Sequence, residues 1–221
     1  MALQIISVLL FTVFFSKALT LVCYNCLTLV PPGTCKQTAN CSSNVGCNSI
    51  TIYNGSNIGN NNWCANSSSC DNWSITLGRI RRSSLCCTSD LCNKATASDS
   101  ENGLMCYTCN DIHCSNTQTQ KCKGEENQCI TTTVNVNNII SKGCASQNFC
   151  KNSTLWRNAL LSSIVGNSIL PNNVLLNNSQ FQQLSMSSVS CCGANLCNNA
   201  PSMAQEAVLL LVPVLSSFLS I

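Results

Sequence analysis

Charged and aromatic residues are scarce in this chain of 221 residues. Asp, Glu, Lys and Arg together make up 9 % of the sequence, and Phe, Trp and Tyr make up 5 %. So few aromatic side chains cannot build a large aromatic-rich core, so other forces must offset the conformational entropy of folding. The formal net charge of +3 is also too small and too scattered for a nucleic-acid-binding protein, whose domains carry clustered Lys and Arg.

Histidine is nearly absent, because His113 is the only one. A serine nucleophile needs a histidine base and is often marked by Gly-x-Ser-x-Gly, a motif that this sequence lacks. A disulfide-rich secreted phospholipase would need a histidine just after a Cys-Cys pair, and neither residues 88–90 nor residues 193–195 contain one. We therefore expect a protein that is not an enzyme and that binds neither a cofactor nor a metal.

Cysteine, in contrast, is abundant, and the N-terminus explains how it is used. Residues 1–20 (MALQIISVLLFTVFFSKALT) are predicted to be a secretory signal peptide, because an apolar run too short to span a bilayer comfortably is followed by small residues. The 20 cysteines then enter an oxidising compartment, where thiols form disulfides rather than hold zinc. We expect the mature chain to begin at Leu21 and to be extracellular.

The C-terminal segment, residues 207–221 (AVLLLVPVLSSFLSI), is apolar and carries no charge. A transmembrane helix normally needs about 20 apolar residues and positive cytoplasmic flanks. Residues 199–221 instead match a signal that is removed and replaced by a glycosylphosphatidylinositol (GPI) lipid. Asn198 is the preferred attachment residue, with Asn199 and Ser202 as alternatives. The other interpretation of the apolar end is a buried C-terminal helix of a secreted domain.

The cysteines form two copies of one framework of ten. Both copies open with Cys-x-x-Cys and close with Cys-Cys-x-x-x-x-Cys. Residues 21–26 (LVCYNC) correspond to residues 104–109 (LMCYTC), and residues 86–93 (CCTSDLCN) correspond to residues 191–198 (CCGANLCN). Spacing alone leaves roughly 900 ways to pair ten cysteines. Adjacent cysteines rarely bridge each other, so the two members of each Cys-Cys pair are expected to have different partners.

The Leu-x-Cys-Tyr-x-Cys opening, the ten-cysteine spacing and the closing Cys-Cys-x-x-x-Leu-Cys-Asn resemble the three-finger family, which includes the urokinase receptor, the lymphocyte antigen six proteins and snake neurotoxins. The resemblance implies a small, all-β, disulfide-rich fold of two tandem three-finger domains, residues 21–93 and 104–198, joined by a linker at residues 94–103. Each domain would be a flat antiparallel sheet with three projecting hairpin loops. Residues 49–53 and 129–136 have the alternation or the β-branched content of strands.

The resemblance also implies the disulfide pairing and leaves no cysteine unpaired. In the first copy the bridges would be Cys23–Cys47, Cys26–Cys35, Cys41–Cys64, Cys70–Cys86 and Cys87–Cys92. In the second copy they would be Cys106–Cys129, Cys109–Cys114, Cys122–Cys144, Cys150–Cys191 and Cys192–Cys197. The asparagine after the last cysteine of each copy, Asn93 or Asn198, is structural in the family.

Asn-x-Ser/Thr sequons predict N-linked glycans on exposed chain. A sixth sequon, at Asn40, has a cysteine in the middle and is disfavoured. Most of the sequons lie in the first copy, which leaves the second copy more open to protein contact. The predicted glycosylation sites are Asn54, Asn66, Asn72, Asn152 and Asn177.

The third finger of the second copy carries an insertion of about 25 residues between Cys150 and Cys191, relative to the interval between Cys70 and Cys86. Its apolar residues recur at the spacing of one helical face, which predicts a short amphipathic helix or a long apolar finger. The segment packs against its own sheet or the neighbouring domain, or it docks a partner through anchor residues. The candidate anchors are Trp156, Leu160 and Ile164.

The third finger of the first copy contains Arg79-Ile80-Arg81-Arg82, the basic pattern that secretory proprotein convertases cleave. We favour the alternative that these residues form an exposed basic loop facing acidic partners or lipid headgroups. If the chain were cut there, the Cys70–Cys86 bridge would keep the pieces joined.

These features predict a GPI-anchored glycoprotein at the outer leaflet of the plasma membrane. It would recognise an extracellular or cell-surface protein as a receptor, co-receptor or adhesion molecule, using finger loops on a rigid base that lowers the entropic cost of binding. The resemblance allows a protease or its zymogen, an adhesion receptor, a gamete-surface protein or a ligand-gated channel as the partner. The alternatives are a secreted two-module inhibitor, resembling phospholipase inhibitors, and a modulator of a ligand-gated channel.

Overall fold

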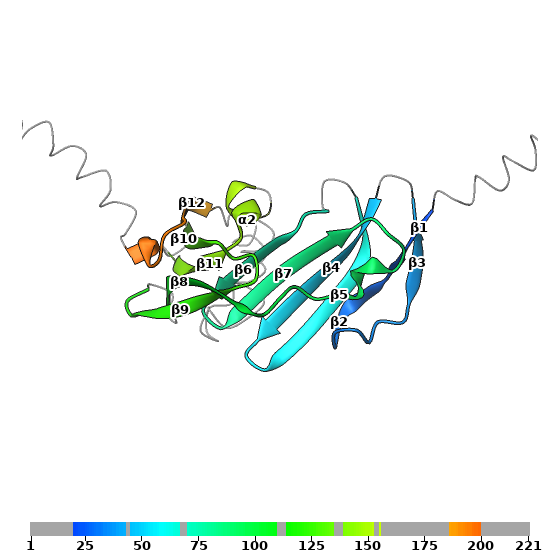
Figure 1. Ribbon diagram of the computed structural model, residues 1–221, viewed down its shortest axis with the longest axis horizontal. Coiled ribbons are helices and arrows are strands. Elements are labelled where there is room, and N and C mark those ends of the chain that lie inside the picture. Colours follow the sequence, from blue (N-terminus) through cyan, green and yellow to red (C-terminus); the bar gives the residue numbers. More distant parts are fainter. Residues whose placement is uncertain are drawn as a thin grey trace, which may run out of the picture. The chain divides into compact units, whose positions relative to one another are not determined.

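The computed structural model describes residues 20–42, 45–66, 70–109, 114–134, 139–152, 155 and 186–199. These residues form mostly β-strands, as Figure 1 shows, together with ten disulfides and very little helix. The predicted all-β, disulfide-rich fold is therefore confirmed. Among the described residues, no helix has both the length and the apolar character needed to cross a membrane.

The chain divides into two compact units that do not follow the sequence order strictly. Unit 1 contains Met1–Asn72 and Arg82–Ala97, and unit 2 contains Trp73–Arg81 and Ser98–Ile221. The chain therefore passes from one unit to the other three times. The stretch Trp73–Arg81 lies between Cys70 and Cys86 of the first cysteine framework, yet it folds as part of unit 2.

Unit 1 is built on the long hairpin of β4 and β5, which pair antiparallel over their whole length. Gly55 has a φ of 61° at the tip of this hairpin, a conformation that glycine adopts without steric penalty. The edge strand β2 pairs with β5, β7 lies next to β4, and β1 pairs separately with β3. The strands are β1 (Leu21–Tyr24), β2 (Cys26–Val30), β3 (Thr38–Cys41), β4 (Val45–Asn54), β5 (Asn57–Asn66) and β7 (Ile80–Cys87), followed by the 3-10 turn η2 (Cys92–Lys94).

Polar side chains fill much of the interior of unit 1, around its disulfides. The Thr51 hydroxyl donates to Oδ1 of the facing Asn60 at 2.6 Å, and Nδ2 of Asn60 donates to Oγ of Ser49 at 3.0 Å. All three side chains are buried. Burial of polar groups is tolerated when they are hydrogen-bonded, as these are. The sequence therefore needs few aromatic residues to fill this sheet.

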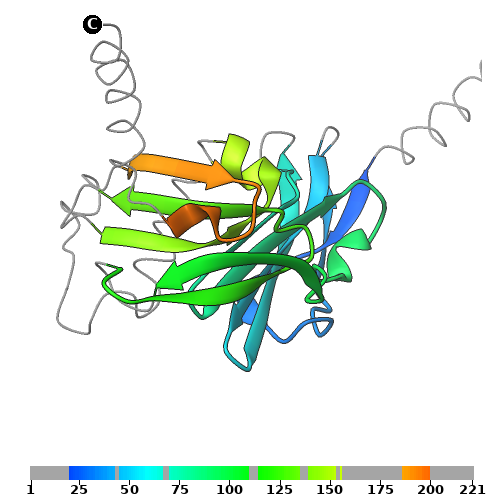
Figure 2. The same cartoon turned by 60° about the vertical axis from the view of Figure 1, so that its left-hand side comes forward.

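Unit 2 contains a sheet in the order β12, β10, β11, β6, and a separate antiparallel pair of β8 with β9. Figure 2 shows the orange β12 alongside the green β10. Its elements are β6 (Trp73–Leu77), β8 (Glu101–Cys109), β9 (Thr117–Lys123), β10 (Gln128–Val134), β11 (Ile139–Ala145), α2 (Gln147–Lys151), β12 (Met186–Cys192) and the 3-10 turn η4 (Cys197–Asn199).

The short helix α2 packs an aromatic residue into unit 2. Ser146 caps its N-terminus, because the Ser146 side chain accepts a hydrogen bond from the Phe149 N–H. Phe149 is fully buried, and its ring centroid lies 5.6 Å from that of Trp73 on β6. This aromatic pair and a separate cluster of buried cysteines both contribute to the core of unit 2.

Several sequence-based expectations can be placed along the chain. Residues 49–53 lie in β4, and β10 contains the described part of residues 129–136. Residues 95–100, within the expected linker, carry no regular element between η2 and β8. The signal peptide up to residue 19 and the C-terminal segment from residue 200 lie outside the described residues. So do His113, Trp156, Leu160, Ile164, Asn177 and Ser202.

Candidate protein-recognition scaffold

All 20 cysteines are paired, and the ten disulfides join the same pairs that the resemblance implies. The Cα atoms of each pair lie between 5.0 and 6.2 Å apart, a separation that a disulfide can span. The bridges are Cys23–Cys47, Cys26–Cys35, Cys41–Cys64, Cys70–Cys86, Cys87–Cys92, Cys106–Cys129, Cys109–Cys114, Cys122–Cys144, Cys150–Cys191 and Cys192–Cys197.

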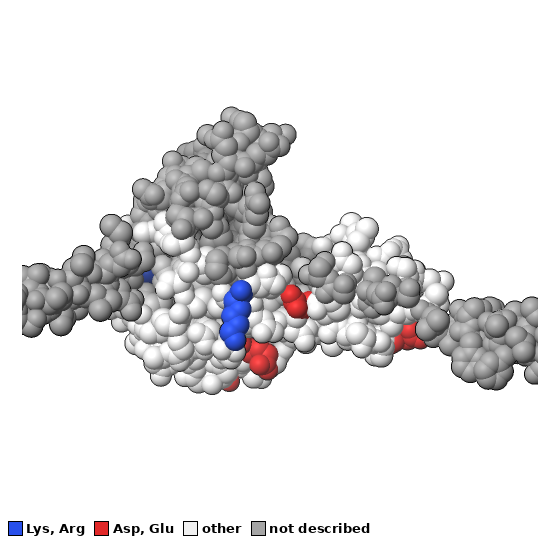
Figure 3. Space-filling model, turned by 90° about the horizontal axis from the view of Figure 1, so that it is seen from above, with Lys and Arg blue, Asp and Glu red and all other residues white. Residues whose placement is uncertain are grey.

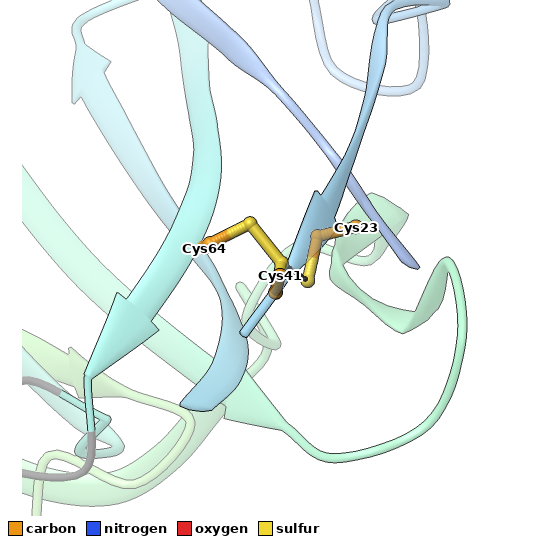
Figure 4. A group of neighbouring side chains, drawn as sticks. All are labelled: Cys23, Cys41 and Cys64. Carbon is orange, nitrogen blue, oxygen red and sulfur yellow. Dashed lines mark hydrogen bonds between the residues drawn. A yellow bond between two sulfur atoms is a disulfide. The ribbon is translucent and has the colours of Figure 1, made fainter. Parts of the chain in front are cut away.

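Two bridges in each unit lie against each other, and Figure 4 shows the Cys41–Cys64 disulfide of unit 1 beside the sulfur of Cys23. The Sγ atom of Cys41, which is bonded to Cys64, lies 3.1 Å from that of Cys23. In unit 2 the corresponding distance, between Cys106 and Cys122, is 3.2 Å. The sulfurs are close enough to suggest a metal site, but each belongs to a disulfide and so offers no thiolate ligand. These clusters are structural cross-links.

The asparagine that closes each framework joins two strands through its side-chain amide. Asn93 accepts a hydrogen bond from the Tyr24 N–H at 3.0 Å and donates to the carbonyls of Tyr24 at 3.0 Å and Asn48 at 2.8 Å. Asn198 makes the same bonds with Tyr107, at 2.9 Å each, and donates to the Ile130 carbonyl at 3.1 Å. Both asparagines are buried. Asn198, the preferred lipid-attachment residue, is therefore also a structural residue of its framework.

A second repeated contact lies just before each of these asparagines. Oδ1 of Asp90 accepts from the Val22 N–H at 2.8 Å, and the next N–H, that of Leu91, donates to the Val22 carbonyl at 2.7 Å. In the second copy, Oδ1 of Asn195 accepts from the Met105 N–H at 2.9 Å, and the following N–H donates to the Met105 carbonyl at 2.7 Å. The sequence analysis missed this contact, although both acceptors occupy the same position in the closing segments.

The exposed basic loop expected at residues 79–82 is wrong for two of its three arginines. Arg79 is exposed at the hairpin turn, but Arg81 and Arg82 are 3 % and 8 % exposed, because they lie within β7. Burial lowers the pKa of the Arg82 guanidinium below its ordinary value, because the charged form loses its hydration. Arg81 and Arg82 are therefore part of the packed sheet and do not form a surface for acidic partners or lipid headgroups.

A buried carboxylate in unit 2 accounts for the burial of Arg81. Glu126, in the turn between β9 and β10, is fully buried, and its Oε1 accepts from the Arg81 Nε at 3.0 Å. The Arg81 guanidinium also contacts Asp99 Oδ1 at 3.2 Å and the Ser98 carbonyl at 2.8 Å. Nothing in the sequence pattern singled out Glu126, since a lone glutamate has no motif.

The predicted glycosylation sites in unit 1 lie at the surface. Asn54, Asn66 and Asn72 are exposed, and Asn152 in unit 2 is half-buried. Asn72 also uses its Oδ1 to accept a hydrogen bond from the Cys86 N–H at 2.7 Å. Asn54 lies at the tip of the β4–β5 hairpin, where a glycan would extend away from the strands.

Exposed apolar side chains gather at the β2 edge of unit 1. Leu27 and Leu29 on β2 are 71 % and 56 % exposed, and Ile58 on the neighbouring β5 is 45 % exposed. Leu29 lies directly over Gly59, where an added Cβ would be only 2.9 Å from its Cδ2. Leu27 and Leu29, two residues apart on β2, lie on one face of the strand, and we call these two leucines the edge patch. Their alternation within β2 is a sequence signal for an exposed apolar strand face.

Neither β2 nor β5 carries a charged residue. Figure 3 likewise shows only a few Lys, Arg, Asp and Glu side chains on the face in view. Partner recognition through unit 1 would therefore depend on apolar and hydrogen-bonding contacts rather than on charge. The expected anchors of the second copy, Trp156, Leu160 and Ile164, lie outside the described residues.

Both copies of the framework match known protein families. Residues 21–93 match the family described as snake toxin and toxin-like protein, and residues 102–164 match the u-PAR/Ly-6 domain. A comparison with curated proteins finds no significant match to the chain. Domains of these two kinds are typically non-enzymatic modules found outside the cell or at its surface, where they recognise other proteins.

Proposed function

Because this chain belongs to the three-finger family of snake toxin-like and u-PAR/Ly-6 domains, we propose that it is a GPI-anchored glycoprotein that binds a protein partner at the cell surface. Extracellular protein recognition is what domains of this family imply. The proposal adds three features to protein recognition: a lipid anchor, N-linked glycans, and a role as receptor, co-receptor or adhesion molecule.

The observation that carries the proposal is the repeated clamp on the backbone in both copies. In each copy one disulfide, Cys23–Cys47 or Cys106–Cys129, and the side-chain amide of Asn93 or Asn198 fix the first strand of the framework to its central strand. Loops held on such a base lose little conformational entropy on binding, so their contacts contribute fully to affinity. The exposed edge patch supplies contact area of the apolar kind that forms interface cores.

The anchor is proposed at Asn198, with Asn199 and Ser202 as alternatives, and the contacts of the framework limit where the chain can be cut. Asn198 must be kept, because its side chain makes three backbone hydrogen bonds. The Asn199 carbonyl accepts a further hydrogen bond from Nζ of Lys142 at 3.0 Å. Removal of residues 199–221 preserves the three hydrogen bonds of the Asn198 side chain. A cut that also removed Asn198 would break its bonds to the backbone of Tyr107 and Ile130.

Phosphatidylinositol-specific phospholipase C tests the anchor directly. Cells expressing the full chain are treated with the enzyme, and the protein is measured in the medium and on the cells. The proposal requires that most of the surface protein be released by the enzyme. Protein that is already free in the medium of untreated cells, with none on the surface, would instead indicate a secreted inhibitor.

Partner recognition needs a separate measurement, because an anchored protein can lack a partner. Proximity labelling on intact cells, followed by identification of the labelled surface proteins, gives the candidates. Each candidate ectodomain is then tested for direct binding to the purified chain released by the phospholipase. A binding surface that includes the edge patch is the expected result, and the Discussion gives the matched variants.

A further inference from the structure

The stretch Trp73–Arg81 completes the sheet of unit 2. Within unit 2, β6 pairs antiparallel with β11, with Leu77 opposite Gly143 and Ile75 opposite Ala145. The other side of β11 is taken by β10. Without β6, the sheet would end at β11 and leave a row of backbone N–H and carbonyl groups unpaired.

The backbone of β6 approaches the backbone of β11 closely at Gly143. An added Cβ at Gly143 would overlap the Thr76 carbonyl oxygen, so only glycine allows this strand to approach. Beyond the paired residues, the Ser146 N–H donates to the Ser74 carbonyl at 2.8 Å, and the Ser74 N–H donates to Oγ of Ser146 at 3.0 Å. Trp73 of β6 also contacts the ring of Phe149 on α2.

The buried carboxylate of Glu126 recognises this strand chemically. Its Oε1 accepts from the Ser74 hydroxyl at 2.6 Å, the Thr76 hydroxyl at 2.7 Å and the Arg81 Nε at 3.0 Å. All three donors come from Trp73–Arg81. The other carboxylate oxygen, Oε2, accepts a hydrogen bond from the Lys123 N–H at 3.1 Å. If the strand left its seat, Glu126 would lose its cation and both hydroxyl donors, and a buried carboxylate tolerates such a loss poorly.

The same docking hides the basic sequence at the turn of the hairpin. Arg81, Arg82 and Ser83 are all buried, and within unit 2 the Arg81 guanidinium is paired with the carboxylate of Glu126. A protease must bind the chain on both sides of the bond it cuts as an extended, accessible segment. The bond after Arg82 cannot enter a protease cleft while β7 is in the sheet.

We propose that Glu126 docks Trp73–Arg81 in unit 2 and thereby withholds Arg81 from proprotein convertases, which makes the sequence Arg79–Arg82 a cryptic cleavage site. In chains where this stretch is undocked, a convertase hydrolyses the peptide bond after Arg82. One water is added across that bond, which yields a new carboxylate on Arg82 and a new amine on Ser83. The Cys70–Cys86 disulfide keeps the two fragments joined, so the cut marks a misassembled chain without dividing it.

The test treats the purified full chain with a soluble proprotein convertase and compares reduced with non-reduced gels. The wild-type chain is expected to stay intact under both conditions. Glu126→Ala is expected to be cleaved roughly 100-fold faster, because Arg81 loses its buried partner. The fragments should separate only after reduction. Glu125→Ala is the matched control, since Glu125 is the exposed neighbour, and should behave as wild type.

Two further measurements cover a failure of Glu126→Ala to fold. Thr76→Val removes only one of the three donors to Glu126 and should give an intermediate cleavage rate. Hydrogen exchange of the wild-type chain should protect the β11 amides at residues 143–145 as strongly as those of β10. Cleavage of the wild type as fast as Glu126→Ala, equal resistance of Glu126→Ala and Glu125→Ala, or edge-like exchange at residues 143–145 would each overturn the proposal.

Discussion

The side-chain amide of Asn93 brackets the backbone of Tyr24, accepting from its N–H and donating to its carbonyl, both at 3.0 Å. The remaining N–H of the amide donates to the Asn48 carbonyl. One side chain therefore joins β1 to β4 and uses both donors of its amide. Asn198 repeats the arrangement in the second copy.

The Asn93→Asp substitution tests this bracket, because a carboxylate keeps the acceptor and loses both donors. Two buried carbonyls, those of Tyr24 and Asn48, would then face a negative charge. We expect the free energy of unfolding to fall by about 3 kcal/mol, measured by chemical denaturation. Asn57→Asp, at an exposed position, should change it by less than about 0.5 kcal/mol. Equal effects of the two substitutions would contradict the structural role of Asn93.

The disulfides are predicted to contribute unequally to stability, in the order of the loops they close. Cys23 and Cys47 are 24 residues apart, whereas Cys87 and Cys92 are 5 apart. Replacing the first pair by alanine should lower the free energy of unfolding by about 3 to 4 kcal/mol, and replacing the second by about 2 kcal/mol. Denaturation of the two double variants under non-reducing conditions measures the difference. If the variant without Cys87–Cys92 lost more stability than the variant without Cys23–Cys47, loop-closure entropy would not be the main contribution of these disulfides to stability.

The edge patch is predicted to contribute to partner binding and not to folding. Leu27→Ser combined with Leu29→Ser removes both of its leucine side chains. Affinity for a partner identified by proximity labelling should fall at least about tenfold, as for other exposed apolar anchors. The thermal unfolding midpoint should stay within a few degrees of wild type.

A matched control for the edge patch is Leu91→Ser, because Leu91 is an exposed leucine outside it. This variant should bind as wild type does. If it weakens binding as much as the double variant, the loss reflects general surface hydrophobicity and the edge patch is not the contact.

Lys142 is predicted to make stability depend on alkaline pH. This buried side chain on β11 donates to the neutral Asn199 carbonyl, and burial lowers its pKa because the ammonium loses hydration. The unfolded chain then binds the proton more tightly than the folded chain. Burying the protonated side chain therefore destabilises the folded state at neutral pH. The free energy of unfolding rises as the pH increases from the lowered folded pKa to the ordinary pKa of 10.5, and this gain is lost again as the pH falls through the folded value.

The Lys142→Met variant isolates that pH dependence, since methionine fills similar space without a charge. It should be more stable than wild type at pH 7, and the advantage should shrink as the pH rises toward 9.5. Thermal unfolding of both proteins at the two pH values gives the comparison. A variant that is less stable at pH 7 would show that the bond to Asn199 outweighs the cost of burying the ammonium.

The cysteine spacing carried most of what could be predicted about the fold. Two frameworks of ten, with matching openings and closings, supported the resemblance to the three-finger family, and that resemblance implied the all-β fold and the disulfide pairs. The structural asparagines were also foreseen, as residues that follow the last cysteine of each copy. The acceptors Asp90 and Asn195 left only a weak signal, since they share a position but not a residue type.

The basic residues show what the sequence could not reveal. Arg79–Arg82 was expected to be exposed because charged runs usually are, and no pattern announced that Glu126, more than forty residues away, would pair with Arg81. A tertiary contact of this kind depends on which strand borders which, and hydrophobic periodicity does not specify that order. The edge patch was missed for the opposite reason: leucines in a strand suggest a core, and only the sheet order makes β2 an edge.

The three passages of the chain between units 1 and 2 bear on how this protein can be divided in the laboratory. A recombinant fragment that starts in the linker would contain the whole second set of cysteines and would still lack the strand that borders β11. The complementary fragment would carry that strand with no seat for it. Fragments meant to isolate one half should therefore follow the structural units, with residues 73–81 grafted onto the C-terminal half, and not the boundary that the cysteine pattern suggests.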